Sequence, residues 1–205
     1  RLSESLRSDW PGLDLLINNA GICASGEIGE AALETFQQVI DVNFNGTLLG
    51  CHTMVPWMRA TESQGHIVNV ASIFGLVAPA SMGAYNTSKA GVVALSETLD
   101  CELKSHGIGV TVVAPGFFES QLIGRGKFAT EQQQKIAEQY VQRAKLTADQ
   151  IVETTLAAVR RKQLYVVLGR KARWIWRLKR WMPSRFAQLM AWRYARKLRK
   201  FSADD

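Results

Sequence analysis

The sequence predicts an α/β fold built on a doubly wound parallel sheet. Short β-rich runs recur along the chain, and a longer segment of helical character separates each from the next. Two of the runs stop at residues typical of loops, Asn18-Asn-Ala-Gly21 and Pro115-Gly116. Strands that alternate with helices favour a parallel sheet that is covered by helices on both faces.

The first half of the chain supplies two of these strands. A polar, helix-like segment at residues 1–8 precedes the apolar run 13–17, which reads as a buried strand. Residues 30–59 have apolar positions at helical spacing and predict one long helix or two. After a break at Gln64-Gly65, residues 66–72 form the second β-rich run.

The second half continues the alternation. Residues 83–105 predict a long helix that Gly107 ends, and residues 108–114 predict a third strand. Residues 117–146 are irregular and then rich in Gln and Glu. Thr147-Ala-Asp-Gln150 is a capping-box pattern that opens a helix to Arg161, and residues 164–168 predict a fourth strand.

Composition indicates one globular domain and gives little support to a metal site. The chain has 205 residues, of which 47% are hydrophobic and 21% charged. Its three cysteines and three histidines are scattered and show no metal-ligand spacing. Unpaired cysteines favour a reducing compartment, so we expect a cytoplasmic protein. Neither a signal peptide pattern nor an apolar run long enough to span a bilayer is present.

The positive charge of the chain is confined to its carboxyl-terminal segment. The net charge is +7, but residues 170–205 hold 12 Lys and Arg against two Asp, while residues 1–169 carry a net charge of −3. We therefore divide the chain into a body at 1–169 and a basic tail at 170–205. The body itself lacks the charge that nucleic-acid binding requires.

The tail predicts two amphipathic helices, separated at Pro183-Ser184, with Ser184 able to cap the second. Apolar residues gather on one side of each helix: Trp174, Ile175, Leu178, Trp181 and Met182 in the first, and Phe186, Met190, Tyr194, Leu198 and Phe201 in the second. Three readings stay open: attachment to a membrane surface through 170–201, packing over the substrate pocket or a neighbouring subunit, and nucleic-acid binding.

Three residues form the strongest chemical pattern. Tyr85 and Lys89 are four residues apart, so a helix places them on one face. A nearby ammonium stabilises a phenolate, which lowers the pKa of a tyrosine from its ordinary value near 10. Ser72 ends a predicted strand, where its hydroxyl could hold a substrate oxygen beside the phenol. The pattern suits proton transfer at a carbonyl or alcohol oxygen.

The order and spacing of these motifs resemble the short-chain dehydrogenase/reductase family. The resemblance covers about residues 10–169 and includes Asn43 and the loops already quoted. It implies a Rossmann-like fold and hydride transfer between NAD or NADP and a carbonyl/alcohol pair. It makes Tyr85 the general acid or base, Lys89 its partner and a ribose ligand, Ser72 the residue that orients the reacting oxygen, and Asn43 the holder of a relay water.

The same resemblance implies further cofactor contacts. These are Asn19, Ala20, Gly21, Tyr85, Lys89, Pro115, Gly116, Phe118 and Ser120. Asn18 is expected to tie strands together. Asn45 competes with Asn43, which the family spacing favours. A homo-oligomer is implied as well, because the two long helices pair subunits in the family.

The family's glycine-rich phosphate loop is not found in the sequence. The resemblance therefore implies that residues 1–169 are a partial dinucleotide-binding or catalytic domain, and we expect a chain truncated at its amino end that lacks its first strands. The alternative function is a non-catalytic binding or scaffold protein that retains the fold without binding cofactor. Residues 117–146 are expected to form a substrate cap, whose apolar residues favour a lipophilic substrate.

Overall fold

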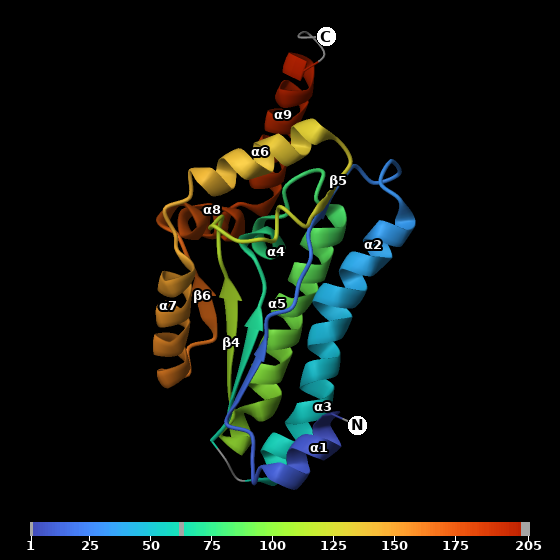
Figure 1. Ribbon diagram of the computed structural model, residues 1–205. Coiled ribbons are helices and arrows are strands. Elements are labelled where there is room, and N and C mark those ends of the chain that lie inside the picture. Colours follow the sequence, from blue (N-terminus) through green and yellow to red (C-terminus); the bar gives the residue numbers. More distant parts are fainter. Residues whose placement is uncertain (1, 62–63, 202–205) are drawn as a thin grey trace.

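The computed structural model describes residues 2–61 and 64–201 (Figure 1). In chain order, its elements are α1 (Leu2–Asp9), β1 (Leu15–Asn18), β2 (Ala24–Ser25), α2 (Leu33–Ile40), the π-helical η1 (Asp41–Asn45), α3 (Gly46–Ala60), β3 (His66–Val70), α4 (Ile73–Val77), α5 (Gly83–Leu103), the 3-10 helix η2 (Lys104–His106), β4 (Gly109–Ala114), β5 (Lys127–Phe128), α6 (Glu131–Gln142), α7 (Ala148–Arg160), β6 (Tyr165–Val167), α8 (Arg170–Trp181) and α9 (Pro183–Phe201).

The main sheet has the strand order β1-β3-β4-β6, and every pairing in it is parallel. The four strands correspond to the four predicted runs. Asn18 pairs in register with Asn69, and Val70 with Val113, so the carboxyl ends of the strands meet at one edge. Side chains that follow these ends are therefore brought together there.

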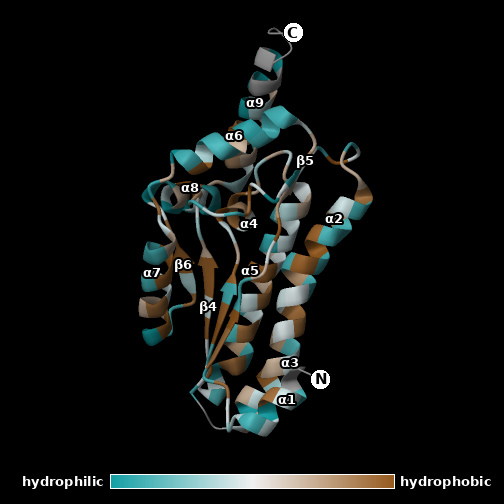
Figure 2. Ribbon diagram, in the orientation of Figure 1, coloured by the Kyte–Doolittle hydropathy of each residue, from teal (hydrophilic) through white to brown (hydrophobic). Residues whose placement is uncertain are grey.

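Helices cover both faces of this sheet, as predicted. On one face, Met58 of α3 and Leu103 of α5 pack against Ile67 and Val110 of the sheet. On the other face, Ala158 of α7 joins Val68, Val113 and Val166. Figure 2 shows β4 as an almost continuous hydrophobic strand, as expected for a strand buried on both sides.

The short helix α4 was not expected from the sequence. It packs so closely on α5 that a Cβ atom added to Gly75 would lie 2.6–2.9 Å from the backbone of Lys89 and Ala90. Because a side chain at position 75 would force the two helices apart, glycine lets α4 rest directly on the helix that carries Tyr85 and Lys89.

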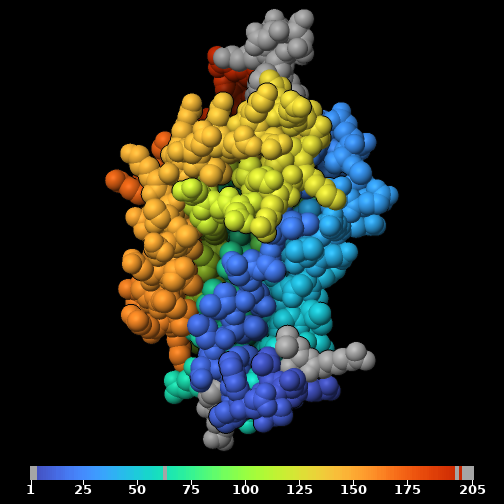
Figure 3. All heavy atoms as spheres, in the orientation of Figure 1, coloured from blue at the N-terminus to red at the C-terminus, as the bar shows by residue number. Residues whose placement is uncertain are grey.

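Residues 117–146 form a segment over the carboxyl edge of the main sheet (Figures 1 and 3). Its short strand β5 pairs in parallel with β2, which follows the loop after β1. Thr130 caps α6 by accepting a hydrogen bond from the backbone nitrogen of Gln133. The segment is thus fastened to the body at the end of the sheet where the candidate site lies.

The basic tail is helical and packs against α4. Ala172 of α8 and Phe186 of α9 lie in a cluster with Ile73 and Val77. Helix α9 begins at Pro183, so the expectation that Ser184 caps it is wrong; proline has no N–H to satisfy and suits the first helical position. The side chains of Leu198 and Phe201 lie outside the described ones.

The first residue of β3 provides a buried polar contact. The Nε2 atom of His66 lies 2.8 Å from the hydroxyl of Thr111, which itself donates to the carbonyl of Gln163. His66 Nε2 therefore carries the proton. Burial, together with the positive charge of Lys162, lowers the pKa of His66 below its ordinary value of 6.5. The folded state thus holds His66 neutral.

This histidine should make stability depend on pH. Because the unfolded chain binds a proton on His66 more readily, the free energy of unfolding falls as pH drops below about 6.5. His66→Gln should lose less stability than the wild type between about pH 7.5 and about pH 5.5, measured by urea unfolding. The exposed His52→Gln is the control and should retain the wild-type slope. Equal slopes for His66→Gln and the wild type would contradict the assignment.

Candidate active site

Ser72 lies two residues beyond the end of β3. It has an extended backbone and caps α4, because its hydroxyl oxygen accepts a hydrogen bond of 3.1 Å from the backbone nitrogen of Phe74. The next residue, Ile73, donates its backbone N–H to the carbonyl of Pro115 at 3.0 Å. The loops that follow β3 and β4 are therefore held together beside Ser72.

Tyr85 and Lys89 lie one turn apart in the first half of α5, as predicted. Both are buried, with 6% and 3% of their surface exposed. The phenol of Tyr85 is hydrogen-bonded to the Ser72 side chain. The Nζ atom of Lys89 donates to the carbonyl of Val70 at 2.8 Å. The three side chains thus meet at the carboxyl end of β3.

The electrostatics of this cluster differ from the expectation. Burial raises the pKa of Tyr85 well above 10, with a smaller increase from the neighbouring Cys23, and the hydrogen bond with Ser72 only partly offsets these effects. Burial also lowers the pKa of Lys89 to about 8. The prediction that Lys89 lowers the pKa of Tyr85 is therefore wrong for this arrangement. The ammonium points at the Val70 carbonyl, and desolvation dominates the phenol.

Asn43 lies in the π-helical turn between α2 and α3 and is fully buried. Its Oδ1 atom accepts from the backbone nitrogen of Ile22 at 2.8 Å. Its Nδ2 atom donates to the Ile22 carbonyl and to the Ser88 hydroxyl, each at 3.0 Å. Asn45, the competitor, is exposed and bonds Asp41. Asn43 therefore ties the loop after β1 to the helix that carries Tyr85.

The loop after β1 approaches the same cluster. A Cβ atom added to Gly21 would lie 3.3 Å from both Asn43 Oδ1 and Lys89 Nζ, so its backbone passes next to these polar groups. Asn18, just before it, donates to Asn69 at 2.8 Å, which confirms that it links two strands. Asn19 and Ala20 lie between these two anchored positions.

The loop after β4 completes the surroundings. Pro115 anchors it to α4, as described above, and Gly116 lies beside Leu168 and Ala172, because an added Cβ atom would be 3.7 Å from the Leu168 carbonyl oxygen and 4.0 Å from the Ala172 Cβ atom. Phe118 forms a bridge with Leu146, at the two ends of the cap segment. Ser120 lies further along the loop and is half-buried.

Sequence reasoning missed the chain of aromatic contacts that extends from Tyr85 into residues 117–146. Phe74 packs edge-on against Tyr85, with ring centroids 6.2 Å apart, and edge-on against Phe117 at 5.5 Å. Phe117 in turn stacks on Tyr140 of α6 at 4.9 Å. Phe117 is one of the apolar residues of the expected cap, but its contact with the ring beside Tyr85 was not predicted. Its place directly after Pro115-Gly116 is the one signal that could have joined it to the site.

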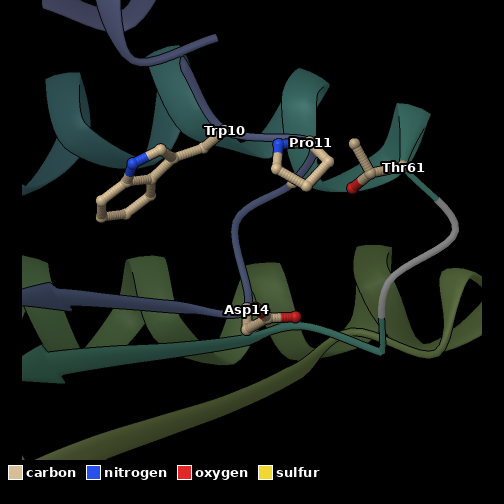
Figure 4. A pocket seen from close by; sticks show the side chains of 5 residues that line it. Trp10, Pro11, Asp14 and Thr61 are labelled. Atoms are coloured by element: carbon tan, nitrogen blue, oxygen red, sulfur yellow. The ribbon is translucent and has the colours of Figure 1, made fainter.

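Other parts of the described chain offer no competing chemistry. Among the described residues, no group of His, Cys, Asp and Glu has the arrangement of a metal site. None of the helices within 2–61 and 64–201 is both long and apolar enough to cross a membrane. A hollow lined by Trp10, Pro11, Gly12, Asp14 and Thr61 lies before β1, at the edge of the sheet opposite Ser72 (Figure 4).

Comparison with known proteins agrees with this arrangement. The family model described as "short chain dehydrogenase" matches residues 1–154. The putative oxidoreductase SadH of Mycobacterium tuberculosis is 33% identical over 178 residues, which cover 85% of this chain and 64% of that protein. An uncharacterized oxidoreductase of Staphylococcus saprophyticus is 36% identical over 123 residues, covering 60% and 52%. The chain thus spans between about half and two thirds of the length of these relatives.

Two solved structures extend the likeness to three dimensions. A short-chain dehydrogenase/reductase from Burkholderia phymatum, in complex with NAD, superposes with a TM-score of 0.80 at 28% identity, covering 87% of this chain and 69% of the other. A short-chain dehydrogenase from Sphingobium yanoikuyae, in complex with NADPH, gives 0.69 at 27% identity, covering 84% and 64%. The motifs, the parallel sheet and the matched family model lead to one conclusion: this chain belongs to the short-chain dehydrogenase/reductase family.

Proposed function

We propose that this protein is an oxidoreductase that transfers a hydride between NAD or NADP and a carbonyl/alcohol pair. The observation that carries the proposal is the buried cluster of Ser72, Tyr85 and Lys89 at the carboxyl end of β3. A hydroxyl and a phenol that share a hydrogen bond can both contact one substrate oxygen. Membership of the family supports the same reaction class.

The raised pKa of Tyr85 assigns it the role of a proton donor at neutral pH. A buried phenol stays protonated, so it can donate to the oxygen of a carbonyl as that oxygen gains negative charge. The Ser72 hydroxyl would donate a second hydrogen bond to the same oxygen. In the oxidation direction Tyr85 would accept the proton as a phenolate, a form that the raised pKa of the buried phenol disfavours in this arrangement.

The residues around the cluster fit a nicotinamide cofactor. Gly21 brings backbone beside Lys89 and Asn43, and Gly116 forms the turn beyond β4 without a side chain. We propose that Asn19, Ala20 and Gly21 lie against the adenosine side of the cofactor and that Tyr85 and Lys89 contact its nicotinamide ribose. Contacts after β4 would come from Pro115, Gly116, Phe118 and Ser120. When bound, the nicotinamide ring gives or takes the hydride. Relatives solved with NAD and with NADPH support either form.

The substrate and assembly are further parts of the proposal. We propose that residues 117–146 act as a cap over the site and that a lipophilic ketone, aldehyde or alcohol binds beneath it. The rings of Phe74, Phe117 and Tyr140 support an apolar pocket. A homo-oligomer is supported by exposed apolar residues on α3, where Leu49 is 64% exposed.

A non-catalytic, fold-retaining binding protein is the second candidate. The burial of the cluster around Ser72 favours it, because only 8% of Ser72 is exposed and the described hollows lie elsewhere on the surface. Fluorescence titration with NADH and NADPH separates the two candidates. A saturable increase in NADH or NADPH fluorescence that Gly21→Val abolishes would support the enzyme. No increase in any preparation containing these 205 residues would support the binding protein.

Replacing the phenol tests the proton-transfer role directly. Tyr85→Phe keeps the buried ring and its contact with Phe74 but removes the proton, so turnover of a ketone panel should fall by about 10²–10⁴. The melting temperature should change little. Tyr140→Phe is the matched control, because that ring stacks in the cap and its hydroxyl is not assigned to the chemistry. Comparable turnover by Tyr85→Phe and the wild type would reject the mechanism.

Replacing the ammonium should separate activity from stability. The pKa of Lys89 is about 8 in the folded protein, whereas its ordinary value is 10.5. Burying the charged ammonium therefore lowers the free energy of unfolding, fully below about pH 8 and less and less as pH rises to 10.5. Lys89→Met should therefore not lower the melting temperature at neutral pH, and its advantage should shrink as pH rises. Turnover should fall at least about tenfold. A lower melting temperature with full activity would show that Lys89 is only structural.

A further inference from the structure

The outer side of α8 is apolar and faces solvent. Five residues occupy it at spacings of one, three and four, which place them on one side of a helix. They are Trp174, Ile175, Leu178, Trp181 and Met182, exposed by 69, 42, 41, 88 and 39%. The sequence predicted that these residues share a side, and the structure shows that this side does not face the core.

A different side of α8 is seated on the body. Ala172 lies in the cluster with α4, and the ring of Trp176 packs against Tyr165 at 5.2 Å. Lys179 donates to the carbonyl of Leu76 at 2.8 Å, near the end of α4. These contacts occupy the inner side and leave the five apolar residues between 39 and 88% exposed.

Basic residues occupy the third side of the helix. Arg173, Arg177 and Arg180 are exposed and recur at spacings of three and four, next to the apolar side. Helix α9 adds a similar combination: Trp192 is 57% exposed, and the guanidinium of Arg196 stacks over its ring at 5.4 Å. The tail thus presents apolar and cationic groups side by side.

The positive charge of the tail and the exposed apolar side of α8 together indicate what kind of partner binds this surface. A second copy of the tail would carry the same net charge of +10, so the two would repel. Nucleic acid would engage the arginines and stack on tryptophan, but it would leave Ile175, Leu178 and Met182 exposed. An anionic bilayer offers phosphates at the headgroup level and hydrocarbon just beneath it.

We propose that the exposed side of α8, with Trp192 of α9, binds the surface of an anionic lipid bilayer. The apolar residues enter the boundary between headgroups and acyl chains, with Trp174 and Trp181 as anchors. Arg173, Arg177 and Arg180 contact lipid phosphates. The surface lies at the end of the sheet that holds Ser72 (Figure 1). The inference goes beyond the proposed oxidoreductase activity, because binding requires neither cofactor nor turnover.

Vesicle flotation measures this interaction directly. The full chain is mixed with phosphatidylcholine vesicles, with or without phosphatidylglycerol, and recovery in the floating fraction is compared. We expect flotation with the anionic vesicles, little with the neutral ones, and release as salt is raised. Quenching of tryptophan fluorescence by brominated lipid reports whether the rings reach the acyl chains.

Two sets of variants separate the charge from the apolar side. The triple variant Arg173→Gln/Arg177→Gln/Arg180→Gln should weaken partition to anionic vesicles about a hundredfold. A control triple variant, Arg59→Gln/Lys104→Gln/Arg161→Gln, removes the same charge from exposed sites elsewhere and should weaken it far less.

The apolar variants remove rings that make few contacts in the folded protein. Trp174→Ala/Trp181→Ala should weaken partition at least about tenfold and abolish most quenching by brominated lipid. The control is Trp10→Ala, which removes a ring 56% exposed near the far end of the sheet.

Three outcomes would overturn the proposal. The first is failure of the wild type to float with anionic vesicles. The second is equal loss in the tail variants and their controls. The third is a wild type that floats without quenching while Trp174→Ala/Trp181→Ala abolishes self-association in sedimentation, which would assign the surface to a second copy. None of these bears on the Tyr85→Phe result, so the two proposals fail independently.

Discussion

The candidate site depends on the burial of one ammonium group at the end of a strand. Lys89 is almost fully enclosed, and its charge is met by the carbonyl of Val70. Removing an ammonium from water is unfavourable, so this contact constrains how α5 crosses β3. Once it is made, Tyr85, one turn earlier on α5, lies beside Ser72, two residues beyond Val70. The geometry of the candidate site therefore follows from where the buried ammonium of Lys89 can be accommodated.

Buried polar side chains hold the surrounding loops to this point. Asn43 connects Ile22 to Ser88, and the Ser88 hydroxyl donates to the carbonyl of Tyr85 at 2.9 Å. Nearer the sheet, Asn69 accepts from Asn18 and donates to Ser96 on α5. Each amide has most of its hydrogen-bonding capacity satisfied, which makes these positions intolerant of change. Rigidity around the cluster thus comes from hydrogen bonds as much as from apolar packing.

The sequence predicted the sheet and the meeting of Tyr85 and Lys89 on one helix because their signals are local. Four β-rich runs and the spacing of Tyr85 and Lys89 require no knowledge of distant contacts. The sequence could not predict α4, a helix of five residues that rests on α5 at Gly75, because this packing depends on residues distant in the chain. The sequence also could not predict that the pKa of Tyr85 is raised, because this depends on desolvation by residues distant in the chain. In the tail, the periodicity identified the apolar side, but only tertiary contacts could reveal which side faces outward.

The position of Phe186 has a practical meaning for where this protein can be cut. Net charge divides the chain at residue 169, yet only 6% of Phe186 is exposed, and Ala172 shares its cluster with α4. A truncation at the charge boundary would strip the cover from Ile73 and Val77, directly beside Ser72. The boundary defined by composition is therefore not a boundary of folding. In a shortened protein, damage to the end of the sheet that holds Ser72 would be mistaken for an effect of losing the tail.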